Sequence, residues 1–164
     1  MEGFSAGQKI SDTLGMRASP TAEVVFGFFF VPSTHVVGEV NGATLWMMRN
    51  LEIERVALAA MSVGIARRAL DDMTPYAHNR PAFGKPNLFG FGQIQKHITE
   101  SYTDCMAGKS YLYGFANGLN LDTYGNGLNA DGVRLYCAQM SKNVANRTIQ
   151  IMGGYPMDRL GILC

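Results

Sequence analysis

The sequence carries little charge, no long uninterrupted apolar run and no paired cysteine motif. Only 16% of its 164 residues are charged, and the net charge is +1 without a basic stripe, so nucleic acid is not an expected partner. The longest apolar stretches are broken by Arg, Glu or Gly before they reach membrane-spanning length, so we expect no membrane insertion. The opening residues MEGFSAGQKI contain neither a secretory apolar core nor an Arg-rich amphipathic pattern.

The three cysteines, Cys105, Cys137 and Cys164, are odd in number and far apart. They form no CxxC pair, and the nearby histidines lack the spacing of zinc ligands. We therefore expect reduced, buried thiols in an intracellular protein, and no metal site.

Residues 1–44 alternate short β-type runs with Gly, Pro and Ser turns. The stretch VVFGFFFVP is short, β-branched and aromatic, and it predicts a strand. A segment of this length cannot close a sheet around its own core, so we expect it to be the end of a larger β domain.

From residue 45 the pattern becomes helical, and a helical domain is expected over 45–164. The spacing predicts helices over residues 45–78, 93–121 and 130–152, with Pro75 kinking the first and Gly153-Gly154 ending the third. In the second helix the expected apolar positions are Ile94, Ile98, Tyr102, Cys105 and Leu112. The fold class is therefore mainly α, an antiparallel bundle preceded by strands.

The predicted bundle is incomplete, because three helices leave one wall open. Small residues that would allow close approach of helices recur along them, at Ala57, Ala59, Ala60, Gly64, Ala107, Gly108 and Gly114. We expect further helices, from another segment or another copy, to complete the bundle by self-association.

Glu54 interrupts an apolar stripe of the first predicted helix. Steps of three and four residues through it give Met47, Leu51, Glu54, Leu58, Met61 and Ile65. Such a carboxylate can be a first-turn acid or the partner of Arg49, Arg55 or a more distant basic group. It can also be a general base whose strength is raised by apolar neighbours. Periodicity alone leaves both interpretations open.

Several motifs in order resemble one family. The stretch GFSAGQKISDTLGMRASPTAEVVF, then VP and VVGEVNG, resembles the end of its middle β domain. NLEIERVALAA resembles the start of its first C-terminal helix, PYAHNRPAFGKP a flavin-contacting loop, and GVRLYCAQ with TIQIMGG the last flavin-binding helix. The chain is thus similar to the acyl-CoA dehydrogenase family, and within it to the branch that acts on isovaleryl-CoA in leucine catabolism.

The resemblance implies an FAD-dependent oxidoreductase with a C-terminal four-helix bundle, acting on an acyl-CoA substrate. Family members are usually homotetramers that pass electrons to electron-transfer flavoprotein. A carboxylate removes the α proton of the thioester while the β hydrogen leaves as hydride. The resemblance implies that the protein is located in the mitochondrial matrix in a eukaryote and in the cytoplasm otherwise. We identify no targeting segment in the sequence.

The resemblance also assigns residues. The branch places its base in the motif L-[DE]-[LI]-E-R, here residues 51–55, so Glu54 takes the catalytic role. The substrate-side positions are Glu52, Ile53, Arg55 and Leu58, of which Leu58 would touch a short branched chain. The FAD-side positions are Arg80, which would reach the pyrophosphate across a subunit boundary, Phe83, Gln93, Gln150, Gly153 and Gly154.

The chain departs from the family pattern in several respects, of which three bear on the site. The expected NGY loop after Gly154 is missing. The loop after Phe83 has about one extra residue, which places Gly92 where a flavin-contacting Gln is expected and puts Gln93 next to it. The N-terminal helical domain and most of the β domain are absent. We therefore expect a C-terminal fragment with little or no activity alone; the alternative is a catalytically inactive, self-associating helical domain.

Overall fold

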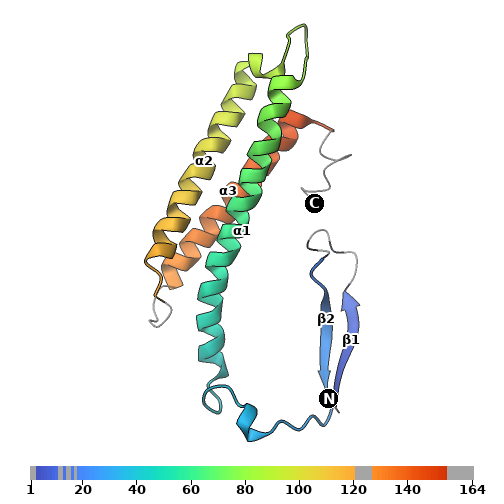
Figure 1. The fold of residues 1–164 in the computed structure, drawn as a ribbon, viewed down its shortest axis with the longest axis vertical. Helices are drawn as coiled ribbons and strands as arrows, with labels where there is room; N and C mark the ends of the chain where they lie inside the picture. Colours follow the sequence, from blue (N-terminus) through green and yellow to red (C-terminus); the bar gives the residue numbers. More distant parts are fainter. Residues whose placement is uncertain (1–2, 11–12, 14–15, 17, 121–126, 155–164) are drawn as a thin grey trace. The chain divides into compact units, whose positions relative to one another are not determined.

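The structure is a computed structural model, and it describes residues 3–10, 13, 16, 18–120 and 127–154. The chain divides into two compact units, with the boundary between Thr44 and Leu45. The prediction of a mainly α chain, with a short β segment before a helical bundle, is confirmed (Figure 1). The elements in chain order are β1 (Phe4–Ile10), β2 (Thr21–Phe26), η1 (Ser33–His35), α1 (Ala43–Asn79), η2 (Leu88–Gly90), α2 (Gly92–Asn117) and α3 (Gly127–Met152).

The first unit is built on one antiparallel pair of strands, β1 and β2. Phe4 pairs with Phe26 and Ile10 with Thr21, with a register shift between Ala6 and Lys9. Every residue of both strands is exposed, as expected for two strands without a covering layer. The Phe4 and Phe26 rings, 5.8 Å apart, provide the cross-strand contact at one end.

The prediction that VVFGFFFVP forms one strand is wrong beyond Phe26. The ladder closes where the Gly27 amide donates to the Gly3 carbonyl at 2.8 Å. Phe28 then has a φ of 50°, in the left-handed region, so the backbone cannot continue as an extended strand. High β propensity at three successive phenylalanines is overridden because no partner strand lies beside them in the described residues.

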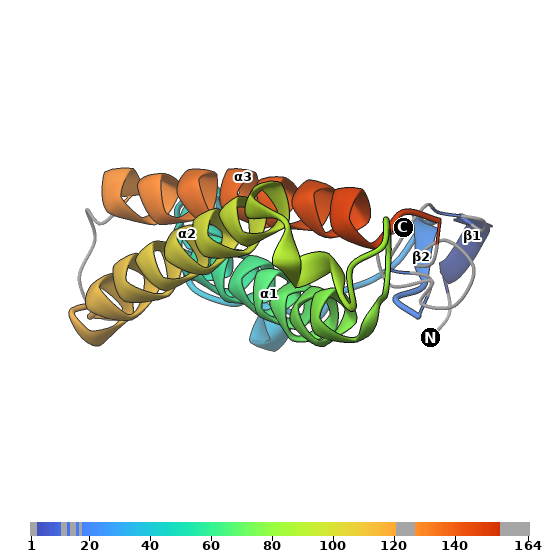
Figure 2. The same ribbon diagram turned by 90° about the horizontal axis from the view of Figure 1, so that it is seen from above.

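The second unit is the helical bundle. Figures 1 and 2 show α1, α2 and α3 side by side, with α2 antiparallel to the other two. Buried residues recur every three or four positions, so each helix turns one apolar face inward. In α3 this face comprises Ala130, Val133, Cys137, Met140, Ser141, Val144, Thr148, Ile151 and Met152.

Glycines let α2 and α3 approach closely. A Cβ on Gly108 would lie 2.8 Å from Met140 Cε, and a Cβ on Gly132 would lie 2.6 Å from Tyr111 Oη. The predicted role of small residues is thus confirmed at Gly108. A Cβ on Gly64 or Gly114 would instead meet no neighbouring atom within 4 Å, so within the described residues these two glycines serve no close packing.

Polar contacts fix how the helices are aligned. The Arg147 guanidinium on α3 pairs with Asp104 at 2.7 Å and with Glu100 at 3.5 Å, both on α2. The Thr148 hydroxyl, which is buried, donates to the Val144 carbonyl at 2.9 Å and lies 3.3 Å from Met73 Sδ on α1. These contacts hold the C-terminal half of α3 between α1 and α2.

The predicted helix bounds need small corrections. α1 begins two residues earlier than predicted, α2 ends four earlier and α3 begins three earlier. Pro75 lies inside α1. Tyr102 was expected on the apolar face but is 55% exposed, and Ser101 is buried in its place. No helix among the described residues is long and apolar enough to cross a bilayer.

The thiols of Cys105 and Cys137 are free and buried, as predicted. Cys164 lies outside the described residues. Burial raises the pKa of both buried thiols above the ordinary thiol range.

Candidate functional site

Glu54 lies about three turns inside α1, because the helix begins at Ala43. The first turn of α1 holds no acidic residue, so the interpretation of Glu54 as a first-turn acid is wrong. Arg55 is not its partner either, since Arg55 Nε lies 2.8 Å from Asp131 Oδ1 on α3. Within the described residues Glu54 makes no ion pair.

The stripe that Glu54 interrupts is apolar and open. Leu58 is half-buried, and the other four members are between 38% and 57% exposed: Met47, Leu51, Met61 and Ile65. Glu54 itself is exposed on the same face. The described residues thus present one carboxylate on an uncovered apolar surface, which suits a proton acceptor next to an acyl chain once that surface is covered.

The other substrate-side residues lie around Glu54 in different directions. Glu52 is half-buried against the start of α3, where a Cβ on Gly127 would lie 3.3 Å from Glu52 Oε1. Ile53 is 39% exposed. Arg55 pairs with Asp131 as described above, so this ion pair joins the same part of α1 to the N-terminal part of α3.

Arg80 follows directly after α1, in the connection to α2. Its amide donates to the Tyr76 carbonyl at 3.0 Å, and its carbonyl accepts from the Leu88 amide at 2.8 Å. The backbone is therefore held on both sides while the side chain is exposed. A fixed backbone with an exposed guanidinium is a suitable arrangement for binding an external anion.

Phe83 lies at the tip of a two-residue hairpin. Ala82 and Lys85 exchange two backbone hydrogen bonds, of 3.2 and 3.0 Å. Phe83 and Gly84 between them have φ values of 52° and 75°, the pattern of a type I′ turn. A bulky residue rarely adopts positive φ, and here the result is an aromatic ring that is 89% exposed.

The remaining cofactor-side residues lie at the same end of the bundle as this connection (Figures 1 and 2). Gln93, in the first turn of α2, is exposed, and its Nε2 lies 3.3 Å from His97 Nε2. Gln150 is exposed on the last turn of α3. Gly153 has a φ of 62° and donates to the Ile149 carbonyl at 2.8 Å, which ends the helix; Gly154 follows it, exposed.

The structure therefore separates the two groups of candidate residues. Glu54 and the end of α1 at Asn79 are 25 residues apart, which is about 38 Å at 1.5 Å per residue. The contacts Arg55–Asp131 and Thr148–Met73 show that α3 runs parallel to α1, so its C-terminal end is equally far from Glu54. Within one chain, Glu54 and Arg80 do not meet.

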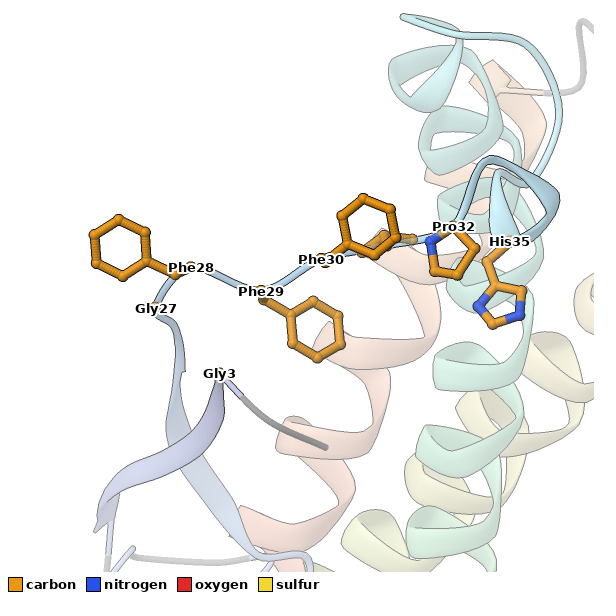
Figure 3. A pocket seen from close by; sticks show the side chains of 8 residues that line it. Gly3, Gly27, Phe28, Phe29, Phe30, Pro32 and His35 are labelled. Atoms are coloured by element: carbon orange, nitrogen blue, oxygen red, sulfur yellow. The ribbon is translucent and has the colours of Figure 1, made fainter.

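A hollow in the first unit was not anticipated from the sequence. It measures about 550 Å³ and is lined by Gly3, Gly27, Phe28, Phe29, Phe30, Val31, Pro32 and His35. Figure 3 shows the Phe28 ring turned away from Gly3, and Phe28 is fully exposed. None of these residues belongs to the substrate-side or FAD-side groups described above. The aromatic run GFFF is the one feature of the sequence that could have indicated this hollow.

Comparison with known proteins decides between family membership and chance similarity. Residues 41–162 match the family "Acyl-CoA dehydrogenase, C-terminal domain". The chain belongs to the acyl-CoA dehydrogenase family. It is 39% identical to the mitochondrial isovaleryl-CoA dehydrogenase of Solanum tuberosum, over 97% of this chain and 39% of that protein. It is 36% identical to the mitochondrial 2-methylacyl-CoA dehydrogenase of the same species, over 98% of this chain and 40% of that protein.

Solved structures of the family share the fold. A probable acyl-CoA dehydrogenase from Mycobacterium abscessus is similar with a TM-score of 0.89 and 27% identity, over 98% of this chain and 42% of that one. Butyryl-CoA dehydrogenase from Megasphaera elsdenii is similar with a TM-score of 0.84 and 29% identity, over 94% and 39%. The chain thus spans about two fifths of the length of these relatives.

Proposed function

We propose that this chain supplies the C-terminal part of an FAD-dependent dehydrogenase that oxidises a short branched acyl-CoA, with isovaleryl-CoA as the first candidate. The observation that carries the proposal is Glu54, an exposed carboxylate without an ion pair in the described residues, set in the apolar stripe of α1. The sequence similarity to isovaleryl-CoA and 2-methylacyl-CoA dehydrogenases supports a branched substrate.

In the proposed reaction Glu54 accepts the proton from the α carbon of the thioester. That proton is weakly acidic, so the base gains from an environment that excludes water. Met47, Leu51, Leu58, Met61 and Ile65 supply such an environment once the acyl chain and the rest of the site cover them. Leu58, one turn beyond Glu54, would contact the branch of the acyl group.

The chemistry of the exposed donors fits FAD. A diphosphate favours a guanidinium on a fixed backbone, which Arg80 provides. Phe83, three residues further along the same connection, offers an exposed aromatic side chain, and Gln93 and Gln150 offer amides at the same end of the bundle. Gly153 and Gly154 leave the backbone open to close approach. When bound, FAD supplies the redox step by accepting hydride from the β carbon.

We propose that one site uses two copies of the chain. A separation of about 38 Å along α1 is too long for Glu54 and Arg80 of one chain to serve the reacting ring and the diphosphate of one FAD. Arg80 of one copy would therefore serve the cofactor beside Glu54 of another. We further propose that the whole enzyme is a homotetramer and that it passes its electrons to electron-transfer flavoprotein. In a eukaryote it would act in the mitochondrial matrix.

A chimera tests the role of Glu54. Residues 1–164 replace the corresponding part of the potato isovaleryl-CoA dehydrogenase, and turnover is followed by bleaching of the flavin. Loss of a general base costs about 10²- to 10⁴-fold in rate, so Glu54→Gln should lower kcat by this amount while the flavin stays bound. Glu100→Gln on α2 is the matched control and should stay within about threefold, since Glu100 pairs with Arg147 and Lys96 and lies on no part of the stripe. Equal losses in both variants would contradict the proposal.

A second candidate function is a self-associating helical module without catalysis. The open stripe on α1 and the uncontacted Gly64 favour it, because both offer surface to another copy. Sedimentation of the purified chain, with and without FAD, separates the two candidates. Oligomers that never retain flavin support the module, whereas flavin retained by the oligomer supports the dehydrogenase.

A further inference from the structure

We infer that Lys85 is a positioning residue, which fixes the hairpin of residues 82–85 so that Phe83 faces outward beside Arg80; this rests on the proposed FAD site. Lys85 is part of a local clasp within the connection between α1 and α2. The clasp consists of the contacts of Lys85 with Gly90 and Phe91, and it joins the hairpin to the segment just before α2.

The first half of the clasp is a hydrogen bond with a packed stem. Lys85 Nζ donates to the Gly90 carbonyl at 2.7 Å, a charge-assisted bond. The aliphatic part of the side chain lies against Gly90, where a Cβ would meet Lys85 Cδ at 3.2 Å. A side chain at position 90 would therefore crowd Lys85. The turn that presents the Gly90 carbonyl is itself held, because Asn87 Oδ1 accepts from the Gly90 amide at 3.1 Å.

The second half of the clasp is aromatic. The Lys85 ammonium lies 4.4 Å from the centre of the Phe91 ring, within the range of a cation–π contact. Phe91 in turn meets the Phe83 ring edge-on, with centroids 5.9 Å apart. Lys85 thus contacts the Gly90 carbonyl and the Phe91 ring, and the Phe91 ring contacts Phe83.

The two backbone hydrogen bonds between Ala82 and Lys85 close the turn, but they do not fix where the Phe83 side chain lies. Phe83 is 89% exposed and its φ of 52° is unfavourable for a bulky residue, so contacts from neighbouring side chains must hold it in place. Lys85 does not need to touch the flavin for this role. It acts through Phe91 and the hairpin, and its effect on FAD passes through Phe83.

The test uses the complete chain with Lys85→Met, which keeps the stem against Gly90 but removes the charge and the donor. Lys85→Arg restores both and is the rescue variant. Lys109→Met is the matched control, since Lys109 lies 5.9 Å from the Tyr113 ring on α2 and away from the connection. Two quantities are measured: nuclear Overhauser contacts between the Phe83 and Phe91 rings in the chain, and the FAD dissociation constant of the chimera described above, from flavin fluorescence.

We expect Lys85→Met to abolish the ring contacts and to weaken FAD binding about tenfold, equivalent to about 1.4 kcal/mol. Lys85→Arg and Lys109→Met should stay within about twofold of the unmodified chain. Ring contacts that persist in Lys85→Met would overturn the positioning role, whether or not FAD binds. Lost contacts with an unchanged dissociation constant would overturn the link to FAD. A chimera with unmodified residues 1–164 that binds no FAD would contradict the proposed function, while the ring contacts in the chain itself still decide the role of Lys85.

Discussion

The ion pair between Arg55 and Asp131 gives a prediction about the segment of α1 that carries Glu54. Arg55 Nε and Asp131 Oδ1 are 2.8 Å apart, and their side chains are 33% and 57% exposed. Exposed pairs of this kind contribute about 0.2–1 kcal/mol in double-mutant cycles, because water screens the charges and two side chains must be ordered. We expect a coupling energy of about 0.5 kcal/mol.

The assay is urea unfolding of four chains, followed by circular dichroism: unmodified, Arg55→Met, Asp131→Asn and the double variant. Each single variant should lower the free energy of unfolding, and the double variant should lose less than the sum, by the coupling energy. Because the pair is exposed, addition of NaCl to about 0.5 M should reduce the coupling. The comparison is valid when the free energy of unfolding falls with urea concentration at the same rate in all four chains.

A coupling energy of zero would refute the reasoning, since the pair would then contribute nothing to docking α1 on α3. That outcome would leave the Arg55 guanidinium available for the CoA part of the substrate, as the family resemblance implies. The matching kinetic result would be a raised KM for Arg55→Met in the chimera, without a change in stability.

Two further predictions concern the core. Met73→Ala should destabilise the chain by about 2–5 kcal/mol, because Met73 is fully buried against Thr148; Met48→Ala, in an exposed position of the same helix, should cost less than about 0.5 kcal/mol. Equal urea midpoints for the two variants would contradict the packing of α1 on α3. Burial raises the pKa of the Cys105 and Cys137 thiols, so the native state keeps protons that unfolded thiols release. The resulting stability is complete below about pH 8.5 and is lost as pH rises through the native pKa. The urea midpoint should therefore fall more between about pH 8 and about pH 10 than in a double Cys→Ala variant, and an identical fall in both would contradict this.

The presence of α1, α2 and α3 could be predicted from the sequence because the apolar periodicity of each is long and regular. The bounds were less accurate, because the ends depend on local contacts that periodicity does not contain. α2 ends at Asn117, where the Gly118 amide turns back to the Phe115 carbonyl at 3.1 Å. The prediction of a strand through Gly27 failed because strand pairing depends on a neighbouring strand, and the described part of the chain offers none beside residues 28–30.

The candidate residues around Glu54 were identified from a sequence motif, yet their surroundings could not be. The partner of Arg55 is Asp131, far along the chain on α3, and local spacing carries no signal for such a contact. Likewise, a positive φ at Phe83 is unexpected for an aromatic residue, although the following Gly84 is typical of a type I′ turn. The clasp around Lys85 emerges only when the hairpin brings residue 85 to Gly90 and Phe91.

The central claim is that one active site takes Glu54 and Arg80 from different copies, and mixing two inactive chimeras tests it most directly. One carries Glu54→Gln and the other Arg80→Ala, and they are co-expressed so that subunits assort randomly. In a two-fold assembly, half of the pairs are hybrids, and each hybrid holds one site with both residues intact, so about a quarter of the full activity should return. No recovery in hybrids that have been shown to form would mean that Glu54 and Arg80 of the same chain serve one site, and would contradict the account.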